Sequence, residues 1–244
     1  MSFDLKGMNI LITGASSGIG RQAALTYGKR RANIIALGRS QSALETLDDD
    51  LVKYNCNVSL VPFNLMQFDL IKDMEQKLSE RIDHLDVLFL NAAAFGSLTP
   101  ITHITEAEWN ETFAVNLTSN VIFLKLFEPY LKKTNQSQVL ISTTEIINQK
   151  KPFWGLYSAS KAALEQIAYS YAEETQNTNI KVNLIDPGIV NTKLRLKAYP
   201  GEDKQKITQP SDLSDFFEDI LFNNKFTNGE LIRYADWLES SKRF

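Results

Sequence analysis

Cysteine and histidine are scarce in this chain of 244 residues, which holds one cysteine, Cys56, and two histidines, His84 and His103. A single thiol excludes an internal disulfide framework and a zinc site built from clustered cysteines. Two histidines far apart in the sequence argue against a Ser/His/Asp triad and against a histidine-rich metal site. We therefore expect no bound metal.

A strong charge bias and a long apolar run are also absent. The chain has 26 Lys and Arg against 29 Asp and Glu, for a net charge of −3. This balance gives no electrostatic basis for binding nucleic acid or an anionic membrane. No uninterrupted apolar run is long enough to span a bilayer, and the first residues, MSFDLKGMNILITG, lack the features of a secretion signal. We expect a cytoplasmic protein without a membrane or nucleic-acid partner.

Short apolar runs alternate along the chain with segments of helical period. The apolar runs cover 8–13, 33–37, 58–63, 86–90, 138–142 and 181–185, and the helical segments between them include 19–31, 42–55, 68–82 and 109–133. Runs that are apolar throughout are typical of a sheet covered on both faces. The alternation predicts an α/β fold with a single doubly wound parallel sheet of about seven strands and helices on both faces.

The sequence shows no repeat and no shift in composition, so we expect a single domain over 1–244. The segment 193–211 is charged and is interrupted by Pro200, Gly201 and Pro210. Such a segment near the end of a strand is typical of a mobile substrate lid. A helix over 212–222 and a final strand over 230–235 are expected to follow it.

The run TGASSGIG at 13–20 lies where the first predicted strand meets the first predicted helix. Glycines let the backbone turn tightly and present its N–H groups, and the helix N-terminus adds a positive dipole end. This arrangement suits a pyrophosphate, although the spacing G-x-x-x-G-x-G differs from the commoner dinucleotide fingerprint. No Gly-Lys-Ser/Thr follows, which disfavours a P-loop. The candidate ligands here are Gly14, Ser16, Ser17, Gly18, Ile19 and Gly20.

The end of the second predicted strand distinguishes between the two nicotinamide dinucleotides. Enzymes that use NAD usually carry an Asp or Glu there, which binds the ribose 2′-hydroxyl. This chain has Arg39 and Ser40 instead. A guanidinium and a hydroxyl suit a 2′-phosphate, so the sequence favours NADP, with NADPH preferred over NADH.

Tyr157 and Lys161 lie four residues apart in a predicted helix, which puts them on one face, one turn apart. A nearby ammonium can stabilise a tyrosinate, and lowering a tyrosine pKa from about 10 by ~3 units takes roughly 4 kcal/mol. A tyrosine so tuned exchanges protons near neutral pH. The alternative is a surface helix on which the two residues are chance neighbours.

Six elements, taken in order, resemble the short-chain dehydrogenase/reductase family over roughly residues 8–192, with a weaker match to about 233. They are TGASSGIG at 13–20, LNAA at 90–93, Asn116 in VNL, STT at 142–144, YSASK at 157–161 and DPGIVNT at 186–192. The resemblance implies a Rossmann-type NAD(P)-binding fold.

The resemblance also implies catalytic roles. Tyr157 takes the place of the proton donor, and Lys161 tunes it and binds the nicotinamide ribose. The family has a serine thirteen residues before the tyrosine, where this chain has Thr144, which keeps the hydroxyl; Thr143 and Ser142 are possible substitutes. Asn116 takes the place of an asparagine that reaches the lysine through a water relay.

Further cofactor contacts follow from the same resemblance. Asn64 and Leu65 occupy the place of the family's Asp-Val pair near adenine. Asn91, Ala92 and Ala93 match the segment that lines the adenine ribose, although LNAA departs from the family's usual NNAG. Pro187, Gly188, Ile189 and Thr192 match the segment that contacts the nicotinamide carboxamide.

These observations predict an NADP(H)-dependent short-chain oxidoreductase acting on a small-molecule carbonyl or alcohol substrate. A dinucleotide-binding protein with little catalysis, acting as a redox sensor or structural partner, is the alternative, and a nucleotide-sugar epimerase is a third reading. Family members commonly pair through the long fourth and fifth helices, so we expect a homodimer or homotetramer. Trp154 either lines the substrate cleft or packs in the core. Lys193, Arg195 and Lys197 either attract an anionic substrate or form the solvated face of the lid.

Overall fold

The computed structural model describes residues 4–222 and 226–241, and it contains a seven-stranded sheet in which every neighbouring pair is parallel. The strand order is β3-β2-β1-β4-β5-β6-β7. The strands are β1 (Asn9–Thr13), β2 (Asn33–Gly38), β3 (Val58–Pro62), β4 (Val87–Leu90), β5 (Ser137–Ser142), β6 (Ile180–Asp186) and β7 (Leu231–Arg233). The structure confirms the predicted doubly wound α/β fold.

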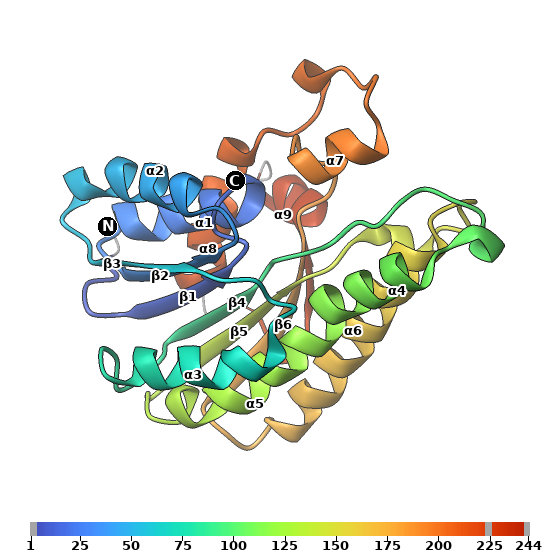
Figure 1. The fold of residues 1–244 in the computed structure, drawn as a ribbon. Helices are drawn as coiled ribbons and strands as arrows, with labels where there is room; N and C mark the ends of the chain where they lie inside the picture. Colours follow the sequence, from blue (N-terminus) through green and yellow to red (C-terminus); the bar gives the residue numbers. More distant parts are fainter. Residues whose placement is uncertain (1–3, 223–225, 242–244) are drawn as a thin grey trace.

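Helices cover both faces of the sheet (Figure 1). They are α1 (Gly18–Lys29), α2 (Gln41–Leu51), α3 (Phe68–Ser79), α4 (Glu106–Phe113), α5 (Ser119–Leu131), α6 (Gly155–Glu174), α7 (Lys193–Ala198), α8 (Ser214–Phe222) and α9 (Tyr234–Ser241). Short 3₁₀ turns cover Val52–Tyr54, Ile101–His103, Glu145–Asn148, Lys204–Lys206 and Pro210–Leu213. Within the described residues, no helix is both long and apolar enough to cross a membrane.

The central residues of most strands are apolar because each face of the sheet meets a separate hydrophobic core. In β1, Ile10 and Ile12 pack with residues of α1, α2 and α8, whereas Leu11 packs with residues of α3, α5 and α6. Side chains alternate between the faces of a strand, so both sets must be apolar when both faces are covered.

The helical segment expected over 109–133 is interrupted. A π-helical turn over Ala114–Thr118 separates α4 from α5, and Asn116 lies within it. The side-chain amide of Asn120 donates hydrogen bonds to the backbone carbonyls of Asn116 at 2.7 Å and Val115 at 3.4 Å. The buried amide thus provides hydrogen bonds to backbone carbonyls in the π-helical turn, where the regular α-helical pattern of hydrogen bonds is interrupted. π-Turns of this kind are frequent at functional sites.

The final strand is shorter than predicted, because β7 ends at Arg233 and Tyr234 begins α9. The reason is aromatic packing at helical spacing. The rings of Tyr234 and Trp237 stack with centroids 5.8 Å apart, and both contact Phe216 of α8. A strand would have turned these two rings to opposite faces.

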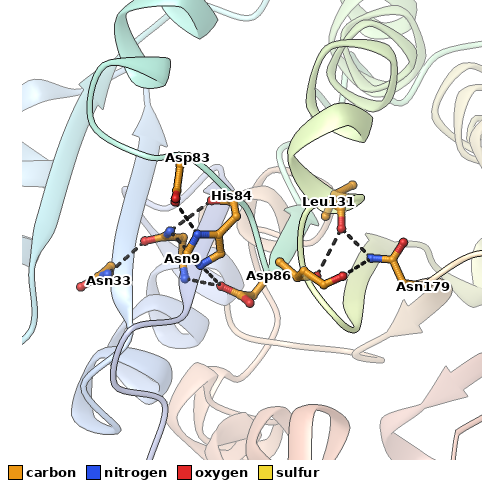
Figure 2. Close-up of polar contacts among 8 residues, drawn as sticks. Asn9, Asn33, Asp83, His84, Asp86, Leu131 and Asn179 are labelled. Carbon is orange, nitrogen blue, oxygen red and sulfur yellow. Dashed lines mark hydrogen bonds and ion pairs between the residues drawn. The ribbon is translucent and has the colours of Figure 1, made fainter.

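Polar side chains tie together the amino ends of the strands (Figure 2). The backbone N–H of Asn9 donates to Asp86 Oδ2 at 2.7 Å, and its side-chain amide donates to the carbonyl of His84 at 3.1 Å. Asn33 Nδ2 donates to Asn9 Oδ1 at 3.0 Å, and Asn179 Nδ2 donates to the last carbonyl of α5 at 2.8 Å. These bonds hold the amino ends of the strands in place. The cavity lies at the opposite side of the sheet, at the carboxyl ends of the strands.

Candidate active site

A cavity of about 410 Å³ opens at the carboxyl ends of the strands. Residues at or just after the ends of six strands line it: Gly14 after β1, Arg39 after β2, Phe63 after β3, Asn91 after β4, Ser142 at the end of β5 and Asp186 at the end of β6. This edge is where open parallel α/β sheets bind their ligands.

Most of the residues singled out from the sequence line this one cavity. They are Gly14, Ser16, Ser17, Gly18, Ile19, Arg39, Asn64, Leu65, Asn91, Ala92, Ala93, Thr144, Tyr157, Lys161, Pro187, Gly188, Ile189 and Thr192. Three others, Gly20, Ser40 and Asn116, are not among the lining residues, and each has a structural contact instead.

Gly14 and Gly20 let the turn after β1 pack against the end of β4. A Cβ added at Gly20 would lie 2.5 Å from Asn91 Nδ2 and 2.5 Å from the carbonyl oxygen of Gly14. Gly14 itself has φ +72°, a conformation that favours glycine. The first turn of α1 carries no acidic residue, so its positive dipole end is not neutralised there. The turn therefore fits a pyrophosphate.

Asn91 joins the ends of three strands. The backbone N–H groups of Asn91 and Ala92 donate to Thr13 Oγ1 at 3.0 and 3.1 Å, and Asn91 Nδ2 donates to the Thr13 carbonyl at 3.1 Å. Asn91 Oδ1 in turn accepts from Ser142 Oγ at 3.2 Å. The side chain thus fixes the floor of the cavity where β1, β4 and β5 meet.

Arg39 is the exposed cation at the end of β2, and it lines the cavity. Ser40 lies beside it in sequence, but its hydroxyl caps α2 by accepting from the N–H of Ala43 at 3.3 Å. Of the two residues singled out for a 2′-phosphate, the structure brings Arg39 to the cavity wall.

Tyr157 and Lys161 both come from α6 and are both buried, Lys161 to 2% exposure. Burial lowers the pKa of Lys161 to about 8, and its Nζ donates to the carbonyl of Ser142 at 3.0 Å. Burial, followed by the charge of Asp186, raises the pKa of Tyr157 well above its ordinary value. The expected lowering of the tyrosine pKa by the lysine is therefore wrong for this structure, because burial disfavours the phenolate and the charge of Asp186 adds to that effect.

Three consecutive hydroxyls, those of Ser142, Thr143 and Thr144, line the cavity beside Tyr157. The Ser142 hydroxyl donates to Asn91, as described above. Thr143 Oγ1 is buried, and its hydroxyl interacts with the Glu165 carboxyl. Thr144 Oγ1 accepts a long bond of 3.4 Å from the N–H of Ile146, which does not engage its own proton. Thr144 is thus a half-buried hydroxyl with a donor to offer in the cavity.

Asn116 is fully buried and holds the wall of the cavity from behind. Its Oδ1 accepts from the N–H of Ala94 at 2.7 Å, and its Nδ2 donates to the Ala94 carbonyl and to Ser160 Oγ, both at 2.9 Å. Ala94 lines the cavity, and Ser160 precedes Lys161 on α6. The side chain therefore ties the segment after β4 to the helix that carries the tyrosine and lysine.

Sequence reasoning gave no role to several other residues that line the cavity. Glu145, Lys151, Asp186 and Tyr199 are among them. Asp186 lies within the DPG run, so that motif could have singled it out. It is 5% exposed, and its Oδ1 accepts from the N–H of Gly188 at 2.9 Å. Lys151 and Tyr199 gave no signal, because they lie 48 residues apart and only the fold brings them together.

Comparison with known proteins gives a consistent family. The family model described as short chain dehydrogenase matches residues 8–203. The chain is 31% identical over 214 residues to "Uncharacterized oxidoreductase YciK" of Escherichia coli strain K12, covering 85% of this chain and 83% of the relative. It is 28% identical over 193 residues to 3-oxoacyl-[acyl-carrier-protein] reductase FabG of Thermotoga maritima, covering 79% of this chain and 78% of that one.

Solved structures agree with this comparison. A short chain dehydrogenase from Shigella flexneri 2a, complexed with NADP, superposes with a TM-score of 0.88 at 26% identity, over 96% of this chain and 99% of the other. One from Escherichia coli CFT073, complexed with NADPH, superposes with a TM-score of 0.87 at 26% identity, over 96% of this chain and 98% of the other.

Proposed function

Because this chain belongs to the short-chain dehydrogenase/reductase family, we propose that it transfers hydride between NADP(H) and a carbonyl or alcohol substrate, with Tyr157 as the acid/base. The observation that carries the proposal is the composition of the cavity. Its wall contains the glycine turn and Arg39 together with Tyr157, Lys161 and Thr144.

The residues present fit a dinucleotide phosphate. The glycine turn leaves no room for a Cβ at Gly20, and the N-terminus of α1 and the guanidinium of Arg39 supply positive charge. The two residues directly after β2, Arg39 and Ser40, are not acidic and so do not repel a 2′-phosphate. Two structural neighbours were solved with NADP or NADPH, which supports the same cofactor here. When bound, NADPH supplies the hydride.

The side chains at the other end of the cavity divide the remaining work of carbonyl reduction. Thr144 Oγ1 donates a hydrogen bond to the substrate oxygen and polarises the carbonyl. Tyr157 then gives its phenolic proton to that oxygen. Lys161, whose pKa of about 8 lets it change protonation near neutral pH, returns a proton to the tyrosine. Asn116 holds α6 in place against the segment after β4 through its hydrogen bonds to Ala94 and Ser160.

Tyr157→Phe tests the acid/base assignment. Removing the phenolic proton should lower turnover of an aldehyde by about 10²–10⁴-fold, while NADPH affinity, measured by calorimetry, stays within threefold. Tyr171→Phe is the matched control, since Tyr171 is a largely buried tyrosine on the same helix that is not among the residues lining the cavity. Turnover near wild type in Tyr157→Phe would refute the role. NADPH binding by the wild type without turnover of any ketone, aldehyde or alcohol would favour a binding protein instead.

A further inference from the structure

Aromatic rings surround the tyrosine at the substrate end of the cavity. Trp154, Tyr157 and Tyr199 line it, and Phe95 packs behind them with its ring centroid 5.3 Å from that of Trp154 and 5.4 Å from that of Tyr157. The rings of Trp154 and Tyr199 lie 5.8 Å apart, which joins the loop before α6 to the end of α7. A molecule next to the Tyr157 hydroxyl therefore meets a wall of rings, which suits a planar or cyclic apolar body.

One cation stands on this wall without an acidic partner. Lys151 Nζ lies 5.4 Å from the ring centroid of Trp154 and 4.8 Å from that of Tyr199, and it donates to the Tyr199 hydroxyl. Lys151 forms no ion pair within the described residues, and an ammonium has three donors, of which the tyrosine takes one. Arg195 also lines the cavity, but Glu202 neutralises it through bonds of 2.6 and 2.5 Å.

The reacting end of the cavity contains two carboxyl groups. Asp186 acts electrostatically on Tyr157, and Glu145 and Arg233 act on Asp186 with opposite signs. Both carboxyls line the cavity together with Lys161, whereas Arg233 is not among the lining residues. An anionic group directly beside the reacting carbonyl would meet these carboxylates, whereas one held across a ring from the carbonyl reaches toward Lys151.

We propose that the substrate is a ring-bearing aldehyde or ketone whose ring packs on Trp154 and Tyr199 and whose far end carries a carboxylate or similar anion paired with Lys151. This inference rests on the proposed function and adds the substrate class to it. It also makes 2-oxo acids, in which the carboxylate adjoins the carbonyl and so the carboxyls of Asp186 and Glu145, the poorer class of substrate.

Three probes separate the elements of this proposal. 4-Formylbenzoate carries its aldehyde and carboxylate on opposite sides of one ring, methyl 4-formylbenzoate lacks the charge, and benzoylformate places the carboxylate next to the carbonyl. We expect the wild type to reduce 4-formylbenzoate with a kcat/KM at least about tenfold above that of the ester, as for a charge-assisted hydrogen bond. Benzoylformate should be the poorest of the three.

Lys151→Met should remove the preference for the acid by raising its KM about tenfold, while the kcat/KM of the ester stays within twofold. Lys150→Met is the matched control, because Lys150 adjoins Lys151 in the same loop, is exposed and is not among the residues lining the cavity. An equal effect of Lys151→Met on acid and ester, a loss of acid preference in Lys150→Met, or a preference for benzoylformate would each overturn the assignment.

A binding measurement keeps this test separate from that of the proposed function. Calorimetry of the NADP⁺-loaded protein with 4-carbamoylbenzoate, whose neutral amide replaces the aldehyde and is not reduced, should show binding that weakens about tenfold in Lys151→Met. If none of the three probes is turned over but 4-carbamoylbenzoate binds through Lys151, the hydride-transfer proposal fails and the anion site stands. If 4-carbamoylbenzoate binds equally to both proteins, or to neither, the anion site fails whatever the turnover.

Discussion

Lys161→Met should make the protein more stable at pH 7 while abolishing its activity. A lysine has an ordinary pKa of 10.5, and burial lowers that of Lys161 to about 8. The folded state therefore disfavours the charged form, and this penalty is complete below pH 8 and disappears as the pH rises through 10.5. The gap between the two values corresponds to about 3 kcal/mol of lost stability at neutral pH.

Methionine fills a similar volume without the charge, but it removes one hydrogen bond. Lys161 Nζ donates to the Ser142 carbonyl at 3.0 Å, and the loss of that bond costs about 1 kcal/mol. The net gain in unfolding free energy should therefore be about 2 kcal/mol at pH 7. Near pH 10.5 the lysine is neutral in the folded state and half neutral in the unfolded state, so the gain should vanish or change sign.

Urea denaturation followed by circular dichroism at pH 7 and pH 10.5 measures both values, with NADPH turnover recorded on the same preparations at pH 7. Lys77→Met provides the control, because Lys77 is an exposed residue of α3 on the side of the sheet away from α1. Its stability should not change with pH relative to the wild type. A Lys161→Met protein that is less stable than the wild type at pH 7 would refute the reasoning, since the lysine would then be a net stabilising residue.

Three further outcomes follow from the geometry of the cavity. Arg39→Ala should weaken NADPH binding by about 10–100-fold and leave NADH binding within twofold, as measured by calorimetry. An equal loss of affinity for both dinucleotides would contradict a contact with the 2′-phosphate. Asp186→Asn removes a charge that raises the Tyr157 pKa. Reduction needs the protonated phenol, so the alkaline limb of its pH profile should move to lower pH. An alkaline limb at the wild-type pH would show that the carboxylate does not act on the tyrosine. Gly20→Ala puts a Cβ 2.5 Å from the carbonyl oxygen of Gly14. It should lower the unfolding free energy by about 1–3 kcal/mol, which a lower melting temperature would show. A wild-type melting temperature would mean that the turn accommodates the Cβ without strain.

The sheet was predictable because a strand that is buried on both faces appears in the sequence as a short run of mostly apolar residues. The same reasoning missed the π-turn around Asn116, since one extra residue in a helix barely alters the spacing of apolar side chains. It also extended the last strand past Arg233, because YADW is apolar enough to pass for a strand. The stacking of Tyr234 on Trp237, which makes that segment helical, depends on Phe216 and is a tertiary contact.

The residues at the phosphate end of the cavity could be predicted from the sequence, whereas several residues at the substrate end could not. The phosphate end is built from one turn and one strand end, so its residues are close in sequence and leave a compact motif. The substrate end takes Lys151 from the loop before α6 and Tyr199 from the end of α7, and neither segment has a pattern that points to the other. Asp186 lay within a motif, but its effect depends on its distance from the tyrosine, which the sequence does not contain.

Burial explains why the tyrosine and lysine form a directional pair. It raises the pKa of Tyr157 and lowers that of Lys161, so at neutral pH the phenol keeps its proton and the ammonium is the group that gives one up readily. Asp186 strengthens the first effect, which makes the phenol a weaker acid but ensures that it is protonated when a carbonyl arrives. A tyrosinate formed by proton donation is then flanked by an ammonium whose pKa is far below that of the phenol, and the proton passes downhill from Lys161 to Tyr157. Oxidation of an alcohol would need the tyrosine to begin as its anion, which the same burial disfavours at neutral pH.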